Sequence, residues 1–272
     1  MLTVGVDLAA EAERTAIAWI DWGPAGAVIQ QVTVGADDRQ IIEAITQAEK
    51  AGIDCPLGWP EKFIAFISAH QHGAVPSPDD VAGRLWRRKL AFRLTDEVVR
   101  DKVGLVPLSV AADRIGHTAM RCAHILAELD RAGQRVDRTG DEVVVEVYPA
   151  ASLHQWKIKP SGYKGKTNEV ARGKVVDDLT AQSRAWLAWG SNDVLCRADD
   201  NALDAVVAGI TARAASLHLV RTPTDEQRAV AVTEGWIAVP TSTLAELWDA
   251  HAASASGACP LCVSCPAPVD QS

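Results

Sequence analysis

Hydrophobic and polar positions alternate at the start of the chain. Over residues 2–8 every second side chain is apolar, and this period of two is typical of a strand with one buried face. Two more strands are predicted over residues 14–21 and 27–34, and the turn at 22–26 joins them. Because the connections between the three strands are short, we expect an antiparallel meander.

The pattern changes to a helical period after the third strand. Apolar residues recur at helical spacing over residues 37–50, and a short strand at 52–54 follows. A largely helical insertion is predicted over about 61–133, and its last helix spans 109–132. The insertion separates the fourth predicted strand from the fifth.

Residues 142–148 (EVVVEVY) form the clearest strand in the sequence, and Pro149 terminates it. Two helices and two short strands are predicted beyond it, at 168–189, 199–215, 229–233 and 236–239. Meander strands followed by strands reached through helical crossovers are typical of a mixed sheet with helices on both faces. The predicted fold class is therefore α/β.

Composition supports one globular domain. The chain has 272 residues, 48% hydrophobic and 23% charged, and we expect one domain over 1–250 and a disordered Ala-, Ser-, Pro- and Cys-containing tail over 251–272. The first residues lack the basic and apolar regions of a signal peptide. No apolar stretch approaches the ~20 residues that span a bilayer. A cytoplasmic location without a membrane partner is expected.

The tail contains three closely spaced cysteines. Cys259, Cys262 and Cys265 could bind Zn²⁺ through their thiolates, with His251 or a partner chain as the source of the fourth ligand. The alternative is a reduced tail without metal, because the two separated cysteine pairs of a usual zinc site are absent from the sequence. Both interpretations stay open at this point.

Acidic residues recur where strands end or a helix begins. Asp7 ends the first strand, Asp54 ends the fourth and Glu146 lies near the end of the fifth, while Asp200 and Asp204 share one side of a helix. If the first and fourth strands pair, their ends lie about 4.8 Å apart. Gathered carboxylates repel one another unless a cation neutralises them, and Mg²⁺ or Mn²⁺ prefers such oxygen ligands. These five acids are the candidate catalytic residues.

Each acid also has a structural interpretation. Asp54 precedes Pro56 and could form a turn, and Asp199 or Asp200 could cap a helix. Glu146 could simply pair with a lysine. Asp7 is the hardest to explain structurally, because it lies within an otherwise apolar strand.

Basic residues cluster in two segments despite a net charge of −8. Residues 84–102 carry seven basic and three acidic side chains, a local charge of +4, and residues 157–174 carry six and one, a local charge of +5. The overall charge argues against a protein that coats nucleic acid, whereas the two segments could contact phosphates or be solvated faces. The candidate substrate-binding residues are Arg87, Arg88, Arg93, Arg100, Lys164 and Lys166.

Five segments together resemble a known family: GVDLA, IDCPLGWP, RLTDEVVR, EVYPAASL and NALDAVVAGITAR, in that order between Leu2 and Pro240. They are similar to domain-of-unknown-function family 429, described as predicted nucleases of ribonuclease H fold. The resemblance implies a five-stranded sheet of order 3-2-1-4-5, with metal on Asp7, Asp54 and Asp204. Holliday-junction resolvases of this superfamily carry two acids three residues apart on the last helix. Here Asn201 stands three residues before Asp204, and the nearest acid is Asp200.

The leading functional hypothesis is a metal-dependent nuclease that hydrolyses phosphodiester bonds of nucleic acid with carboxylate-bound Mg²⁺ or Mn²⁺. One alternative is a non-catalytic binding or regulatory protein of the same fold. Another is an ATP-using enzyme of the actin or sugar-kinase type. Those enzymes need a glycine and a hydroxyl residue after the first-strand aspartate, where this chain has Leu8-Ala9-Ala10-Glu11. The sequence leaves DNA, RNA and small phosphodiesters open as substrates.

Overall fold

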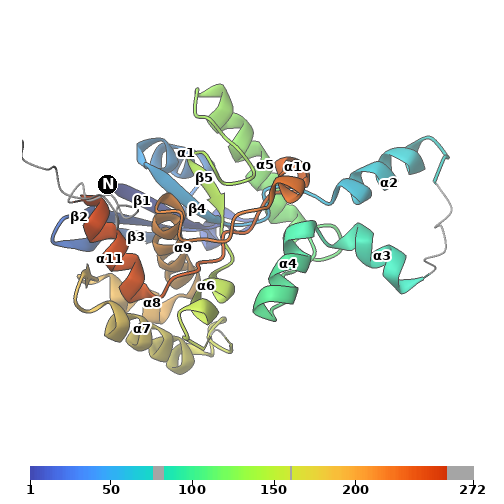
Figure 1. Ribbon diagram of the computed structural model, residues 1–272. Helices are drawn as coiled ribbons and strands as arrows, with labels where there is room; N and C mark the ends of the chain where they lie inside the picture. Colours follow the sequence, from blue (N-terminus) through green and yellow to red (C-terminus); the bar gives the residue numbers. More distant parts are fainter. Residues whose placement is uncertain (76–82, 160, 256–272) are drawn as a thin grey trace, which may run out of the picture.

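A mixed sheet forms the centre of the molecule (Figure 1). The computed structural model describes residues 1–75, 83–159 and 161–255. The strands are β1 (Leu2–Asp7), β2 (Ala16–Gly23), β3 (Gly26–Val34), β4 (Lys50–Asp54), β5 (Val144–Glu146) and β6 (Leu187–Ala188). Their order across the sheet is β5-β4-β1-β2-β3-β6. The strands β1, β2 and β3 are antiparallel, and β4, β5 and β6 each run parallel to their neighbour.

The predicted meander is confirmed, and the order of the first five strands agrees with the expected 3-2-1-4-5. The sixth strand was missed, because residues 168–189 were predicted to be one helix. The helix α7 (Glu169–Ser183) ends earlier, and β6 follows it. The strand exists because Ala27 on β3 donates a backbone hydrogen bond to the Trp186 carbonyl, a contact between distant segments that local periodicity does not register.

Helices cover both faces of the sheet. On one face α1 (Asp38–Gln47) and α5 (Ile115–Arg131) pack on apolar side chains of β1 and β4, including Val4 and Val6. On the other face lies α9 (Asp200–Ser216), whose residues 202–215 are all buried. A helix that is enclosed all round belongs to the core rather than to the surface. Around it are α6 (Pro149–Gln155), α7, α8 (Asn192–Ala198) and α11 (Leu244–Ala255).

Glycines let α9 approach the sheet closely. A Cβ added at Gly5 of β1 would lie 1.9 Å from the Ala205 carbonyl oxygen of α9, and one at Gly52 of β4 would lie 2.5 Å from the Ala208 oxygen. Only glycine permits such contact between backbones. The same approach brings Asp204 of α9 toward the ends of β1 and β4.

The predicted insertion is helical, and its first three helices form an arm that projects from the sheet (Figure 1). The insertion contains α2 (Glu61–Gln71), α3 (Arg84–Ala91) and α4 (Leu94–Val103) and ends with α5. Among its described residues, α2 and α3 contribute none to the buried core. The helix α4 packs against α6 and against α10 (Asp225–Glu234), and these contacts join the arm to the body.

Two predictions for the C-terminal region were wrong. The expected strand at 229–233 lies in the helix α10, whose start is fixed by a capping box between Thr224 and Gln227. Residues 236–239 form no named strand, although Ile237 makes an isolated bridge to Glu146. Both segments are short and apolar, and such runs do not distinguish a strand from a buried helix.

The expected tail boundary at 251 falls inside α11, which continues to Ala255. His251 is buried, and its ring nitrogens contact Arg213 Nη2 and the Gly23 carbonyl, so both are engaged without metal. The cysteines Cys259, Cys262 and Cys265 lie outside the described residues. Within the described residues, no helix combines the length and the apolar character that crossing a membrane requires.

Candidate metal centre

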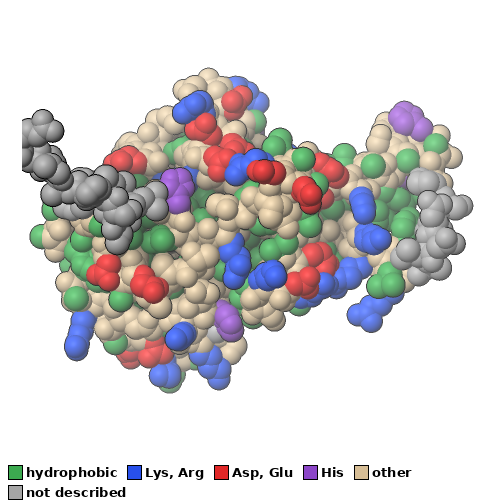
Figure 2. Space-filling view, viewed as in Figure 1, with side chains coloured by type: hydrophobic (Ala, Val, Ile, Leu, Met, Phe, Trp, Pro, Cys, Tyr) green, Lys and Arg blue, Asp and Glu red, His purple; other side chains and the backbone are tan. Residues whose placement is uncertain are grey.

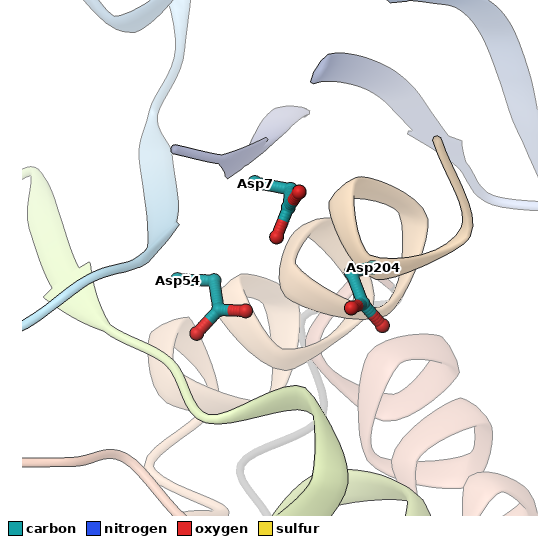
Figure 3. Close-up of side chains that lie close together, drawn as sticks. All are labelled: Asp7, Asp54 and Asp204. Atoms are coloured by element: carbon teal, nitrogen blue, oxygen red, sulfur yellow. The ribbon is translucent and has the colours of Figure 1, made fainter. Parts of the chain in front are cut away.

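Three aspartates meet at one edge of the sheet (Figure 3). Asp7 and Asp54 are register partners at the C-terminal ends of the parallel strands β1 and β4, and Asp204 comes from the second turn of α9. One carboxylate oxygen from each residue lies within 4.8 Å of the other two. Asp204 is 1% exposed and Asp7 is 8% exposed, while the Asp54 side chain is 18% exposed. The strand pairing expected from the sequence therefore does bring these acids together.

Burial and mutual repulsion disfavour ionisation of this cluster. Burial, followed by repulsion from Asp204 and Asp54, raises the pKa of Asp7 well above its ordinary value. Burial also raises the pKa of Asp54 to about 6, although Lys164 opposes that shift. A hydrogen bond between the two carboxyl groups favours the proton on Asp7 and the charge on Asp54. Burial and repulsion thus favour the protonated form of these carboxyl groups, and a bound cation would favour the charged form.

Two side chains of the loop before α7 contact Asp204. Tyr163 Oη donates a hydrogen bond to Asp204 Oδ1 at 2.6 Å, and Lys164 Nζ lies 2.6 Å from Asp204 Oδ2. The Lys164 ammonium lies 4.0 Å from Asp54 Oδ2, while the side chain as a whole is 55% exposed. Desolvation opposes its charge, but the neighbouring carboxylates outweigh that effect and raise the pKa of Lys164. Lys164, predicted to bind substrate, is therefore the counter-charge of the cluster in this structure.

The loop that carries Lys164 is held by two charged residues. Arg172 is buried, and its guanidinium donates hydrogen bonds to the carbonyl oxygens of Tyr163 and Gly165. The backbone N–H of Gly165 donates to Asp200 Oδ2 at 3.2 Å. Arg172 counted toward the positive charge of its segment, yet its role in the structure is to shape the loop.

Asp200 lies outside the three-aspartate cluster. The N-cap of α9 is Asp199, whose Oδ1 accepts hydrogen bonds from the backbone N–H groups of Asn201 and Ala202. Capping rotates the first turn so that Asp200 faces the loop before α7, whereas Asp204 faces Asp7 and Asp54. The spacing of four residues did not place both acids at the same site.

Glu146 is engaged by Arg93 rather than by the aspartates. Its two carboxylate oxygens accept hydrogen bonds from Arg93 Nη2 and Nη1 at 2.7 and 2.8 Å, and Oε2 also accepts from the Leu57 N–H at 3.0 Å. Arg93 pairs with Asp96 as well and is 1% exposed. The sequence allowed a lysine partner for Glu146, and the structure supplies an arginine. Enclosed between two carboxylates, Arg93 is not displayed on a surface.

The remaining predicted basic residues lie on other parts of the molecule. Arg88 pairs with Glu97 at 2.9 Å, and Arg100 pairs with the same glutamate. Arg87 and Lys166 are exposed. Figure 2 shows basic side chains on the projecting arm interspersed with acidic ones rather than gathered in one patch. Of the six predicted substrate-binding residues, the cleft described next is lined by Arg93 and Lys164 alone.

A cleft of about 430 Å³ opens at the carboxylate cluster: Asp7 and Asp54 line its floor, and Asp204 lies next to them. Its walls include two exposed arginines that the sequence analysis missed, Arg14 at the end of the 3₁₀ helix Ala12–Arg14 and Arg114 at the start of α5. Neither arginine has an ion-pair partner within the part of the chain that the structure describes. The cleft also has apolar and aromatic walls, formed by Pro107, Leu108, Ile115 and Tyr148. Isolated arginines outside a charge cluster carry no sequence signal for such a role.

The fold and the site define an α/β protein whose mixed sheet carries a carboxylate cluster at the ends of two parallel strands. The chain belongs to the family described as protein of unknown function, DUF429, whose match covers residues 5–228. No curated protein and no solved structure matches the chain. The matched range includes all three aspartates of the cluster and the whole helical insertion.

Proposed function

We propose that this protein is a metal-dependent nuclease of ribonuclease H-like fold that hydrolyses phosphodiester bonds in nucleic acid. The observation that carries the proposal is the convergence of Asp7, Asp54 and Asp204, three desolvated carboxyl groups from three elements, beside a cleft whose floor Asp7 and Asp54 line. A purely structural cluster of this kind would only cost stability, because like charges buried together repel.

The donor set fits Mg²⁺ or Mn²⁺. All three side chains offer hard oxygen ligands, which these ions prefer. When bound, such an ion supplies Lewis-acid activation of a water and neutralises the charge on the leaving oxygen. Tyr163 fixes the orientation of Asp204, and Lys164 holds a positive charge beside Asp54. The chain's own residues thereby keep the three carboxylates aligned before substrate arrives.

The two other candidate catalytic acids act in this proposal as positioning residues. Glu146 accepts hydrogen bonds from Arg93 and from the Leu57 N–H, and these bonds fix the segment that follows Asp54. Asp200 holds Gly165 and with it the loop that presents Lys164. Neither carboxylate is within the cluster that would hold the metal.

The proposal is tested by calorimetry with Mn²⁺ on the wild-type protein and on the Asp7→Asn variant, together with hydrolysis of labelled oligonucleotides. We expect metal binding and hydrolysis in the wild type and a loss of both in the variant. Equal Mn²⁺ affinity in the two proteins would exclude the site. Metal binding without hydrolysis of DNA or RNA would exclude the nuclease.

A second candidate is a non-catalytic binding or regulatory protein of the same fold, and Lys164 is the observation that favours it. An ammonium 2.6 Å from Asp204 already supplies part of the neutralising charge that a metal would provide. Replacement of Lys164 by alanine separates the two candidates. Mn²⁺ affinity rises if the ammonium competes with metal, and the fold loses stability without gaining metal affinity if the ammonium is the permanent counter-charge.

A further inference from the structure

The charge and shape of the cleft bear on which substrate could reach the aspartates. Asp7 and Asp54 line the floor, and Asp204 lies next to them. Lys164 pairs with this cluster, whereas Arg14 and Arg114, which also line the cleft, have no ion-pair partner among the described residues. The fourth cation, Arg93, is already neutralised by Glu146 and Asp96. The four cations and five carboxylates named here carry a formal charge of −1 on a chain of net charge −8, and a divalent cation on the three aspartates would make the site positive. Such a site attracts phosphates although the whole molecule repels them.

The position of the two arginines favours a chain of phosphates over a single one. Arg14 follows β1 and Arg114 opens α5, so they enter the cleft from two elements that are distant in sequence. Lys164 already lies at the floor, beside Asp54 and Asp204. A ligand with one phosphate bound at the floor would leave one or both rim guanidiniums unused. In a longer nucleic acid, the phosphates on either side of the phosphodiester at the aspartates would contact the guanidinium groups of Arg14 and Arg114.

The burial of the floor disfavours a duplex. Asp204 and Asp7 are nearly enclosed, and the cleft has the volume of a small-ligand pocket, for which about 300–1,000 Å³ is usual. A flexible single strand can bring one phosphodiester into such a pocket, whereas a duplex, whose persistence length is about 150 base pairs, bends into it only at a cost in free energy. Apolar walls beside basic residues are also the combination that binds unpaired bases without sequence preference. Leu108 supplies such a wall, since its side chain is exposed at the cleft although it is apolar.

We infer that the cleft binds single-stranded nucleic acid, with Arg14 and Arg114 on the phosphates that flank the bond at the floor and Leu108 against an unpaired base. The inference rests on the proposed function, because it takes the three aspartates to be the reacting site. It adds the substrate class and three contact residues that neither the acidic cluster nor the basic segments indicated.

The test is fluorescence anisotropy with a labelled single-stranded oligonucleotide, its duplex and a dinucleotide with one phosphodiester, all in Ca²⁺. We expect the wild type to bind the single strand at least tenfold more tightly than the duplex. The Arg14→Ala/Arg114→Ala double variant should bind the single strand about tenfold more weakly, and its salt slope should fall by about 1.4, because each phosphate contact on a single strand contributes about 0.7. Its affinity for the dinucleotide should be unchanged.

The matched control is Arg184→Ala, which removes an exposed arginine that follows α7 and lines no part of the cleft. It should bind all three ligands as the wild type does. Leu108→Ser should weaken single-strand binding while leaving the salt slope unchanged, since it removes an apolar contact and no charge. Duplex binding equal to single-strand binding, or an unaffected double variant, would overturn the inference. Mn²⁺ calorimetry on the same variants distinguishes failure of this inference from failure of the proposed nuclease function. The double variant retains all three metal ligands, so it should bind Mn²⁺ as the wild type does.

Discussion

At the scale of single residues, the protein contains two kinds of buried carboxylate. Glu146 is fully paired, since both of its oxygens face Arg93 and one also accepts a backbone N–H. Asp7 faces two other aspartates and only a partial counter-charge from Lys164. Burial with partners stabilises a fold, whereas burial among like charges opposes it. Replacing the paired carboxylate of Glu146 should therefore lower the stability of the fold, whereas replacing one of the mutually repelling aspartates should raise it.

Replacing Glu146 by glutamine should destabilise the protein by about 3 kcal/mol, because breaking a buried ion pair typically costs about 3–5 kcal/mol and Asp96 still pairs with Arg93. Urea denaturation measures this change. The control Arg88→Ala removes a partly exposed pair with Glu97 and a cation–π contact with Phe92, and should cost no more than about 1–2 kcal/mol. A cost for Glu146→Gln as small as the control's would show that Glu146 is not a structural anchor.

The raised pKa values of Asp7 and Asp54 predict a pH dependence of stability without metal. Both carboxyl groups bind protons more tightly in the folded than in the unfolded protein, so their contribution is fully present below pH about 3.9. It is lost as the pH rises through the folded-state pKa, which is about 6 for Asp54 and well above its ordinary value for Asp7. The difference in unfolding free energy between the Asp7→Asn/Asp54→Asn variant and the wild type should therefore grow in the variant's favour from pH 5 to pH 8.

Taking this difference removes the contribution of groups common to both proteins, including His251. Saturating Mn²⁺ at pH 8 should stabilise the wild type and leave the double variant unchanged. A difference that stays constant with pH would mean that neither carboxyl group has a raised pKa.

At the scale of elements, the site depends on how closely α9 packs on β1 and β4. Gly5→Ala would place a methyl group 1.9 Å from the Ala205 oxygen, so the helix must move away from the strand. We expect a loss of about 3 kcal/mol or more, at the upper end of the usual cost of overpacking. Because Asp204 moves with α9, Mn²⁺ affinity should also fall.

The control for this variant is Gly173→Ala within α7, where the added Cβ meets only the end of Arg197 at 3.5 Å. Alanine favours a helix interior by about 1 kcal/mol relative to glycine, so this variant should be slightly more stable than the wild type. Thermal melts and calorimetry on the pair report both effects. If the Gly5→Ala protein is destabilised but binds Mn²⁺ with wild-type affinity, the geometry of the metal site does not depend on how closely α9 packs on β1.

At the scale of the whole molecule, α11 closes the core on the side away from the arm. Leu244 and Leu247 are buried in the same cluster as α9, and Trp248 stacks on Trp186 with ring centroids 5.8 Å apart. A chain ending at residue 255 should melt as the full chain does. Leu247→Ala should cost about 2–5 kcal/mol, because it empties a core position. Circular dichroism melts test both, and equal melting of Leu247→Ala and wild type would show that α11 is not part of the cooperative core.

The sequence by itself determined the elements with a clear local pattern and the acids at their ends, but neither β6 nor the C-terminal helix α10. Alternation over 2–8, helical spacing over 37–50 and the apolar run at 142–148 each act within a few residues, so pattern alone locates them. The register of Asp7 with Asp54 follows from parallel pairing of two such strands, which is why these acids could be predicted as neighbours.

Only the tertiary structure decided the partners of the other charged residues. Glu146 and Arg93 are 53 positions apart, Lys164 reaches Asp204 across 40, and Arg14 and Arg114 meet at one cleft from separate elements. Composition placed Arg93 and Arg172 among surface charges, yet both are buried because carboxylates or carbonyl oxygens surround them. Burial and contacts with residues distant in sequence decide whether a charged side chain is solvated, paired or free to bind a ligand. The periodicity of apolar residues along the chain gives no information on either.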